Sequence, residues 1–391
     1  MERKKIIIAV VPDSFKGSMT ALEAALCIER GLKRVLTNVV IRKIPMADGG
    51  DGTVQTVVDA TGGKLLTRAV RNPTGRRVQA MFGVTGDGKT AVIEMATASG
   101  LVLLAPKERN PMITSTYGTG ELIRHALDLG VRRILVGIGG SATNDGGMGM
   151  ARALGIRFVD SCGRDLREGG GALKKLAKIC PERLDDRIRK VSIDVACDVD
   201  NPLVGPRGAA RVYGPQKGAT PAMVRELDAG LRQMAKIIKR DLGKTILNVP
   251  GSGAAGGLGG GLMAFLGGRL KPGVSMVMDA INLKKRLKGC NLVITGEGRM
   301  DGQTAFGKAP AGVAAMADRL GISTIAISGC VGADVGKVNS IGIYAYFSAL
   351  QEPIEETMLP RRGPAMLEDC AAQIARLMVL NFPGKRNLHL K

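Results

Sequence analysis

The hydrophobic pattern at the two ends of the chain predicts parallel strands that alternate with helices. Continuous apolar runs occur at Lys5–Val11 and Leu292–Thr295, and the first is rich in β-branched residues, as is typical of strands buried on both faces. Helical spacing of apolar residues follows the first strand at Ala21–Leu36, and a helix-like run follows the second at Ala311–Leu320. This is the pattern of an α/β layer, whose sites lie in loops at the carboxyl ends of the strands.

The middle of the chain has a different pattern. Short alternating segments at Lys64–Val70, Arg77–Gly83 and Thr90–Ala96 are joined by turn residues, which predicts an antiparallel meander. Strand–helix alternation resumes after the glycine-rich run Gly251–Gly261. We therefore predict an α/β fold in which residues 1–62 and 283–391 form one discontinuous parallel-sheet domain and residues 63–282 form an inserted mixed α/β domain.

Composition disfavours several classes of partner. Lys and Arg number 56 against 35 Asp and Glu, a formal charge of +21. Because these basic residues are spread out and aromatic residues make up only 3%, we expect a surface that attracts anionic metabolites and no specific nucleic-acid site. Seven cysteines without a CxxC pair favour a reducing, cytoplasmic location. No apolar run approaches the ~20 residues of a membrane span, so no membrane partner is expected, and the oligomeric state stays open.

Histidine chemistry has little support, because the chain has only two histidines. His125 falls on a predicted helix surface and His389 in the C-terminal tail, so His-dependent triads and zinc sites are not expected. The remaining chemistry-bearing residues are acids, cations, glycines and hydroxyls. Phosphoryl transfer needs little else, since it relies on cations, Mg²⁺ and one carboxylate that receives a hydroxyl proton.

Three glycine-rich stretches match known motifs in letters. Gly83–Thr90 matches G-x4-G-K-T but joins two alternating strands, which predicts a hairpin turn. Gly302–Lys308 matches G-x4-G-K before a helix, but Ala309 replaces the hydroxyl that would hold Mg²⁺, so only a phosphate-facing Lys308 is expected. Gly251–Gly256 matches GxGxxG without the expected strand, which favours close helix packing and a backbone lining for a ligand over a dinucleotide site.

Carboxylates stand beside glycines in four loops, three of which follow predicted strands. One acid in a turn is usually a cap, but four such loops favour a shared site. Carboxylates, waters and substrate phosphates are the ligands that Mg²⁺ prefers. Ser141 lies in the GGSAT run of one of these loops, where a phosphate-binding or capping hydroxyl is favoured over a nucleophile. The acidic loops hold Asp48 and Asp51, Asn144 and Asp145, Asp198 with Asp200 and Asn201, and Glu297 and Asp301.

Six motifs in chain order resemble those of the bacterial class I glycerate kinases. The resemblance implies ATP-dependent phosphorylation of D-glycerate with Mg²⁺, 2-phosphoglycerate being favoured over 3-phosphoglycerate as the product. It also implies a flavodoxin-like, Rossmann-like parallel-sheet domain with a second α/β domain inserted. The motifs are PDSFKGS at 12–18, ADGGDG at 47–52, IGGSATNDGG at 138–147, CDVDNPL at 197–203, GPQKGA at 214–219 and TGEGRMDGQT at 295–304.

Two positions depart from the usual family pattern. Asp51 stands where the family has Glu, so a role there in binding metal or a proton would require a closer approach. Ala305-Phe306 also differs, which leaves the contacts of that segment open. Two alternatives remain: a kinase for another small hydroxy acid, and a non-catalytic sugar-acid binding protein of the same fold. The acids in the glycine loops argue against the second.

The candidate residues form three groups. We expect catalysis by Asp198, Asp48, Glu297 and Lys16, with Asp48, Asp198 and Glu297 also the candidates for holding Mg²⁺; the sequence does not say which of them is the base. Candidates for binding D-glycerate are Asp13, Ser14, Lys16, Arg299, Asp301 and Gln303. Candidates for binding ATP are Gly139, Gly140, Ser141, Asn144, Asp145, Gly146, Lys217 and Lys308.

Overall fold

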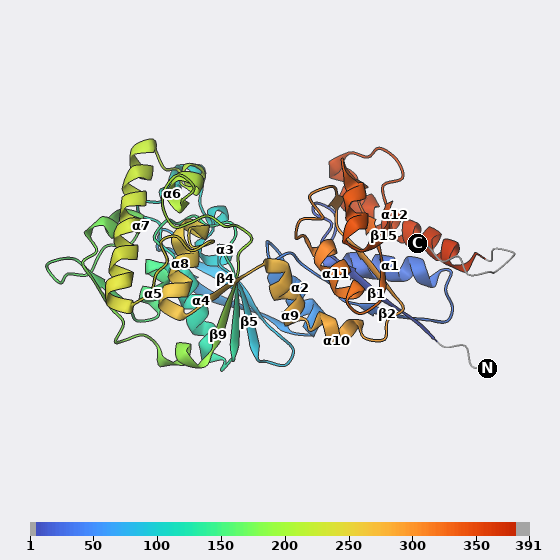
Figure 1. Ribbon diagram of the computed structural model, residues 1–391, viewed down its shortest axis with the longest axis horizontal. Helices are drawn as coiled ribbons and strands as arrows, with labels where there is room; N and C mark the ends of the chain where they lie inside the picture. The colour runs from blue at the N-terminus through green and yellow to red at the C-terminus, as the bar shows by residue number, and fades with distance from the viewer. Residues whose placement is uncertain (1–4, 381–391) are drawn as a thin grey trace. The chain divides into compact units, whose positions relative to one another are not determined.

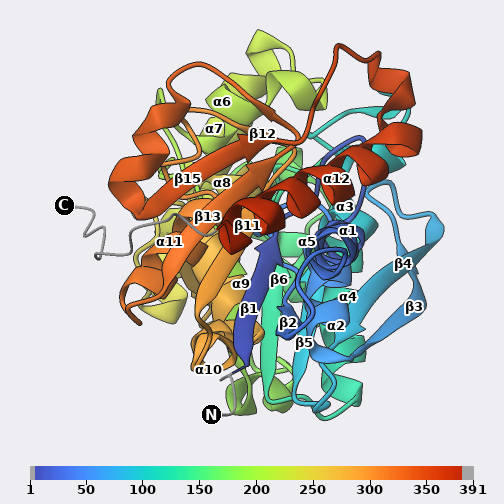
Figure 2. The same ribbon diagram turned by 90° about the vertical axis from the view of Figure 1, so that its right-hand side faces the viewer.

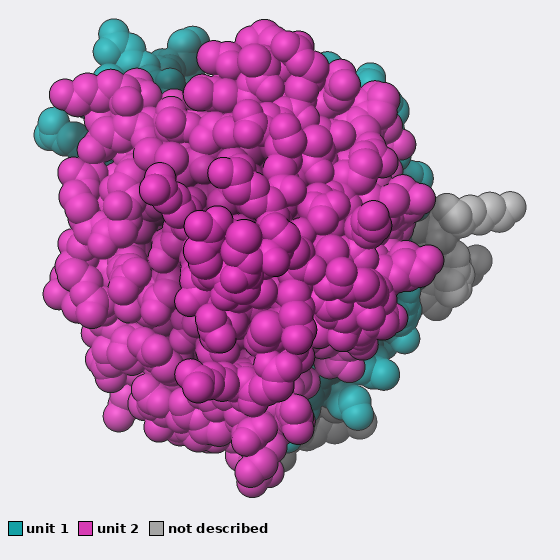
Figure 3. Space-filling model, turned by 90° about the vertical axis from the view of Figure 1, so that its left-hand side faces the viewer, with its two compact units in different colours: residues 1–47, 282–391 teal, residues 48–281 magenta. Residues whose placement is uncertain are grey.

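The chain divides into two compact units. The computed structural model describes residues 5–380, so His389 lies outside the described residues. Unit 1 comprises Met1–Ala47 and Asn282–Lys391, and unit 2 comprises Asp48–Ile281; Figure 3 colours them teal and magenta. None of the helices within residues 5–380 combines the length and the apolar character that crossing a membrane requires.

Unit 1 is built on a five-stranded parallel sheet. Its strand order is β15-β13-β11-β1-β2, and Figure 2 shows β15, β13, β11 and β1 side by side. Numbered within the unit, this order is 2-1-3-4-5, the flavodoxin-like order, which confirms the predicted fold class. The chain changes direction across the sheet between β1 and β11. The strands are β1 (Ile6–Pro12), β2 (Val39–Lys43), β11 (Leu292–Gly296), β13 (Ser323–Ser328) and β15 (Ile343–Ser348).

Helices cover both faces of this sheet. Successive side chains of a strand point to opposite faces, so each face presents apolar residues to a helix. Ile327 packs with α1 (Ala21–Lys33) and α12 (Leu359–Val379), whereas the neighbouring Ala326 packs with Ala314 of α11 (Ala309–Asp318) on the opposite face. Helix α12 begins at Leu359 and has Pro360 in its first turn. Proline in the first turn is compatible with a helix, since that N–H has no helical partner. The unit also contains α10 (Leu283–Leu287) and the short parallel strands β12 (Arg299–Met300) and β14 (Cys330–Val331).

Unit 2 is built on a six-stranded mixed sheet in the order β10-β9-β6-β5-β4-β3. Strands β3, β4 and β5 pair antiparallel, as the meander predicted, and β5, β6, β9 and β10 pair parallel. The G-x4-G-K-T match forms the turn of the β4–β5 hairpin, as expected. The strands are β3 (Lys64–Arg71), β4 (Arg77–Val84), β5 (Thr90–Glu94), β6 (Arg133–Gly137), β9 (Ser192–Ala196) and β10 (Arg269–Lys271).

Helices and a small ribbon complete unit 2. Figure 1 shows α7 as its long helix, which contacts α8. The charged segment 160–190 contains β8, which pairs antiparallel with β7. The remaining elements are α2 (Thr53–Thr61), α3 (Ala96–Ser99), α4 (Tyr117–Asp128), α5 (Met148–Ala153), β7 (Arg157–Val159), β8 (Lys178–Cys180), α6 (Ala209–Tyr213), α7 (Pro221–Leu242), α8 (Ala254–Leu266) and α9 (Gly273–Ala280).

Helix α2 belongs to unit 2, whereas sequence patterning grouped it with the N-terminal strands. The contacts divide the chain after Ala47 and after Ile281, compared with the predicted boundaries after residues 62 and 282. The reason is packing between α2 and β4: a Cβ on Gly83 would lie 2.6 Å from Val58 and 3.1 Å from Val54. A glycine on the strand lets the helix approach, and periodicity alone does not report that partnership.

The GxGxxG run serves close packing between α8 and the loop at 143–147. Gly256 has φ +69, and a Cβ there would lie 1.9 Å from the carbonyl oxygen of Thr143. A Cβ on Gly261 would lie 2.3 Å from the carbonyl oxygen of Gly146. This agrees with the packing interpretation of the run.

Gly256→Ala should therefore destabilise the protein more than Gly267→Ala. Both glycines have a nearly equal positive φ, but nothing lies within 4 Å of a Cβ on Gly267. Strain at positive φ is expected to cost about 1 kcal/mol in each variant, and overpacking adds about 2 kcal/mol in Gly256→Ala alone. Urea unfolding midpoints measure the difference. Equal midpoints in the two variants would show that the loop at 143–147 can move to accommodate the methyl group and that the close packing contributes little to stability.

Candidate active site

The first group of candidate residues lies where β1 and β11 end, at the point where the strand order of unit 1 reverses. The backbone N–H of Asp13 donates to the carbonyl oxygen of Gly296 at 2.8 Å, which joins the two loops. A Cβ on Gly298 would lie 3.1 Å from the backbone nitrogen of Lys16, so the loops also touch farther along. The loop after β1 carries Asp13, Ser14 and Lys16, and the loop after β11 carries Glu297, Arg299, Asp301 and Gln303.

Glu297 is the buried acid of this group. Its Oε1 accepts a hydrogen bond from Thr304 Oγ1 at 2.6 Å, and its Oε2 lies 3.6 Å from Lys308 Nζ. Burial raises the pKa of Glu297, although the bond from Thr304 and the charge of Lys308 both oppose that shift. A carboxylate with elevated proton affinity beside a cation is suited to binding a metal or moving a proton.

Lys308 lies between two carboxylates. Its Nζ is 4.0 Å from Asp301 Oδ1 as well as 3.6 Å from Glu297, and the residue forms the N-cap of α11. Asp301 also lies 3.7 Å from Arg299 Nε and accepts from the backbone N–H of Gln303 at 2.9 Å. Cations and acids therefore alternate in this loop, and a bound anion would compete with Asp301 and Glu297 for Lys308.

Lys16 and Arg299 present exposed side chains. Gly17 next to Lys16 has φ +76, a turn geometry that favours glycine. Within residues 5–380, no carboxylate lies at ion-pair distance from Lys16. An exposed cation of this kind suits recognition of a carboxylate or phosphate.

The second group of candidate residues lies in unit 2, where two acids meet over Gly273. Its backbone N–H donates to Asp198 Oδ1 at 2.9 Å. A Cβ on Gly273 would lie 2.2 Å from the carbonyl oxygen of Asp48 and 3.0 Å from Asp198 Oδ2, so glycine is what lets the two loops meet. The pKa of Asp198 is raised first by burial of its carboxylate and then by the charge of Asp48, while the bond from Gly273 opposes the shift.

The donor set of Asp48 and Asp198 fits Mg²⁺. This ion is usually held by one or two carboxylates together with waters and substrate phosphates, and two neighbouring carboxylates that repel each other are relieved by a cation. Among residues 5–380 there is no group of three or more His, Cys, Asp or Glu arranged to hold a metal. Glu297, the third predicted ligand, belongs to unit 1 and lies beside Thr304 and Lys308.

Asp145 holds the glycine-rich loop that follows β6. Its carboxylate accepts from the backbone N–H and hydroxyl of Thr116, both at 2.9 Å, and from the backbone N–H groups of Gly147 and Gly149, both at 3.1 Å. Burial raises the pKa of Asp145, and these hydrogen bonds oppose the shift. Of residues 139–147, Gly139 and Gly140 are exposed and the others are buried, so the backbone of these two glycines is what the loop offers a ligand.

Lys217 supports the same loop from inside. Its Nζ donates to Ser141 Oγ at 2.6 Å and to the carbonyl oxygen of Thr143 at 2.7 Å, and the residue is 1% exposed. Burial lowers the pKa of Lys217 to about 7, and the charge of Asp145 opposes that shift. The side-chain amide of Asn144 is buried and has no hydrogen-bond partner among residues 5–380, a costly state that a bound water would relieve.

The contribution of Lys217 to stability should depend on pH. Its pKa in the folded protein is about 7, below the ordinary 10.5, so the unfolded chain binds the proton more tightly. Wild-type protein should therefore gain stability relative to Lys217→Met as pH rises from about 7 toward 10.5. Unfolding free energies of both proteins across this window test the expectation. A constant difference would mean that burial leaves the Lys217 pKa unchanged.

Glu94 is a candidate that the sequence analysis missed. It ends β5, and its Oε1 accepts from the backbone N–H of Val54 at the start of α2 at 2.9 Å. Burial raises the pKa of Glu94, and the backbone bonds from α2 oppose the shift. A Cβ on Gly137, which ends the adjacent β6, would lie 3.8 Å from Glu94 Cγ and 3.4 Å from the carbonyl oxygen of Gly49. The sequence feature that could have identified Glu94 is its position as an acid at the end of an apolar strand.

The Asp200 loop is a surface structure. Asp200 pairs with Arg207 at 2.7 Å, and both side chains are well exposed. Asn201 accepts from the Tyr213 hydroxyl at 2.6 Å and donates to the carbonyl oxygen of Arg207 at 2.8 Å. Of the acids in this loop, Asp198 is therefore the one that meets another candidate acid.

Comparison with known proteins identifies the family of the chain. The family model described as "Glycerate kinase family" matches residues 7–379. A glycerate kinase from Halalkalibacterium halodurans is 53% identical over 94% of this chain and 97% of its own length, and the glycerate 2-kinase of Escherichia coli K12 is 49% identical over 88% and 90%. The crystal structure of a protein named glycerate kinase 2, from Salmonella typhimurium LT2, superimposes with a TM-score of 0.90 at 45% identity, covering 96% of this chain and 98% of that one. The chain belongs to the glycerate kinase family.

Proposed function

We propose that the protein transfers the terminal phosphoryl group of ATP to D-glycerate, with the 2-hydroxyl as the favoured acceptor. The observation that carries the proposal is the pair Asp48 and Asp198, which meet over Gly273 in a member of this family. Burial, and then the charge of Asp48, raise the pKa of Asp198. The naming of the Escherichia coli relative as a glycerate 2-kinase supports the 2-hydroxyl. The free thiols of all seven cysteines suit a cytoplasmic location.

Asp198 is the proposed general base. A base works best when its pKa lies nearer the working pH than that of an ordinary carboxylate, and the pKa of Asp198 is raised. It would accept the proton of the substrate hydroxyl as that oxygen attacks the phosphorus. With Asp198 as the base, Asp48 is the proposed carboxylate ligand of Mg²⁺ and Glu297 is a further candidate. The bound ion would neutralise charge on the phosphates.

D-Glycerate is proposed to bind the loops after β1 and β11. Its carboxylate needs cations, and Lys16 and Arg299 are the exposed ones in these loops. Its two hydroxyls need donors and acceptors of the kind that carboxylate, hydroxyl and amide groups supply. The proposed partners for the hydroxyls are Asp13, Ser14, Asp301 and Gln303.

Each unit has its own candidate for binding the ATP phosphates: Lys308 in unit 1 and the loop at 139–147 in unit 2. Gly139 and Gly140 would offer backbone N–H groups to the phosphates. The amide of Asn144 is buried, so we propose that it supports the loop from inside through a bound water. Ser141, Asp145 and Lys217 bond to protein groups, so we propose that they act by holding the loop, together with Gly146 at φ +60.

A coupled assay of ADP release tests the proposal. With ATP and Mg²⁺, D-glycerate should be turned over much faster than L-glycerate and other small hydroxy acids. Preference for another acid would assign the protein to a different substrate, and absence of ADP release with every acid would contradict a kinase function.

A further inference from the structure

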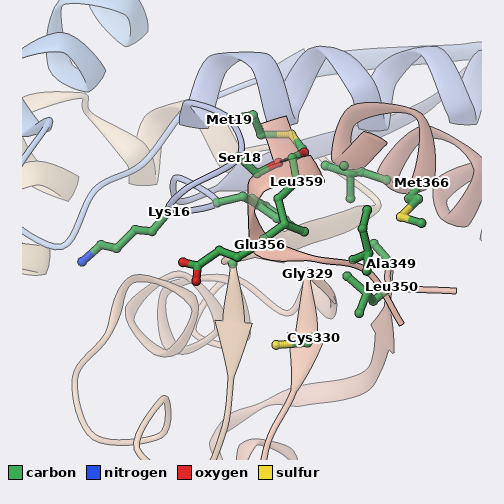
Figure 4. Close-up of a pocket in the computed structure, with 15 residues that line it drawn as sticks. Lys16, Ser18, Met19, Gly329, Cys330, Ala349, Leu350, Glu356, Leu359 and Met366 are labelled. Atoms are coloured by element: carbon green, nitrogen blue, oxygen red, sulfur yellow. Dashed lines mark hydrogen bonds between the residues drawn. The ribbon is translucent and has the colours of Figure 1, made fainter. Parts of the chain in front are cut away.

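Unit 1 contains an apolar cavity of about 200 Å³. It lies against the segments that directly follow the parallel strands β1, β11, β13 and β15, and the first turns of α12 close it (Figure 4). None of the candidate residues assigned above fills it. Its apolar lining includes Met19, Ala349, Leu350, Leu359, Met366 and Leu367.

The walls of this cavity are apolar side chains and close-packed backbone. A Cβ on Gly329 would lie 2.4 Å from the carbonyl oxygen of Gly298, so two loops meet there without side chains. The hydroxyl of Ser18 faces the wall, where it donates to the carbonyl oxygen of Leu359 at 3.0 Å. The interior therefore suits an uncharged, largely apolar group, held by contact area and by backbone polar groups.

The rim of the cavity is charged. Lys16 and Glu356 lie on it, and Figure 4 shows Lys16 extending away from Ala349, Leu350 and Met366. Gly298 in the wall directly follows Glu297, so the loop that carries the acids and Lys308 begins at the cavity edge. A ligand that filled the cavity would have its protruding end beside these charged groups.

An apolar interior with a charged rim suits a ligand that has an apolar body and a charged end. D-Glycerate is small and polar and would leave the apolar surface unused. A nucleobase has weakly polar faces and is joined to phosphates, and sheets with this strand order bind ligands at the carboxyl edge where the order reverses. We propose that this cavity binds the nucleobase of the phosphoryl donor, which directs its phosphates toward Lys308. This inference rests on the proposed kinase function.

Leu350→Trp tests the assignment by filling the cavity from a half-buried position. Leu377→Trp is the matched control, since Leu377 is 53% exposed on α12 and does not line the cavity. Calorimetry with the full chain would measure binding of ADP and of inorganic tripolyphosphate, which has no base. We expect Leu350→Trp to weaken ADP binding about tenfold or more, a loss of ~1.4 kcal/mol, and to leave tripolyphosphate binding within about twofold. Leu377→Trp should change neither.

Three results would overturn the assignment: unchanged ADP binding in folded Leu350→Trp, equal loss of ADP and tripolyphosphate binding, or equal loss of ADP binding in the control. Leu350→Ala, which removes the wall instead of filling the space, provides a second variant and should weaken ADP binding by about threefold to fivefold. Thermal unfolding confirms that each variant is folded. Wild-type turnover of D-glycerate is measured in parallel, so failure of the cavity assignment with turnover intact is distinct from failure of the kinase function.

Discussion

Asp198→Asn should lower kcat with D-glycerate by at least about 100-fold while the KM values for D-glycerate and ATP change by less than about threefold. Asparagine keeps the size of the side chain and can still accept the backbone hydrogen bond from Gly273. It cannot receive the substrate proton, and it presents no charge to Mg²⁺. Steady-state kinetics with both substrates varied would measure the separate effects on kcat and KM.

Asp200→Asn is the matched control for this variant. Asp200 lies two residues away, is exposed and pairs with Arg207, a surface ion pair of small energetic value. The kcat of the Asp200→Asn variant should stay within about twofold of the wild-type value. Activity of Asp198→Asn within about threefold of wild type would mean that Asp198 is neither the base nor an essential metal ligand.

Glu297→Gln should lower kcat/KM by about 10- to 100-fold without lowering the unfolding temperature. Glutamine can accept the hydrogen bond from Thr304, but the charge that faces Lys308 is lost. Because burial raises the pKa of Glu297, ionising it disfavours folding at neutral pH, and removing the charge removes that penalty. If Glu297 is buried for function, its replacement should reduce activity while stability is maintained.

The pH profile separates this role of Glu297 from a structural one. Wild-type activity should fall as pH drops through the raised pKa of Glu297, because the carboxylate is then protonated. Glu297→Gln should lose the part of the acidic limb that Glu297 contributes and keep the part set by the base Asp198, whereas the exposed Glu355→Gln should retain the wild-type profile. An unchanged acidic limb in Glu297→Gln would assign the limb to another group and leave Glu297 without an ionisation-linked role.

Strands and helices were the part of the fold that the sequence predicted best. The run Lys5–Val11 corresponds to β1, and the predicted helix at Ala21–Leu36 corresponds to α1, because a buried strand and an amphipathic helix each have a recognisable hydrophobic pattern. The β4–β5 hairpin was predicted from alternation against a motif match in letters. The placement of α2 was not predicted, since it depends on the fit of Val54 and Val58 over Gly83, a contact with no periodicity.

The sequence predicted which loops carry polar chemistry better than it predicted what each side chain does there. Asp48 and Asp198 were both candidates, and Gly273, which lets them meet, follows them far along the chain. Asp145 and Lys217 were candidates for touching ATP, but their charged groups bond to Thr116, Ser141 and the loop backbone. Such partners come together only through the fold. The apolar cavity in unit 1 could not be predicted from the sequence, because its apolar lining residues cannot be distinguished there from residues of the hydrophobic core.

The most direct test of the account is the proton-coupled phosphorus NMR spectrum of the product formed from D-glycerate, ATP and Mg²⁺. Phosphate on the 2-hydroxyl is attached to a carbon with one hydrogen, so its new signal should be a doublet. A triplet-like signal, from the two hydrogens beside the 3-hydroxyl, would contradict the proposed acceptor. Absence of any new organic phosphate signal from active, folded protein would contradict the proposed function itself.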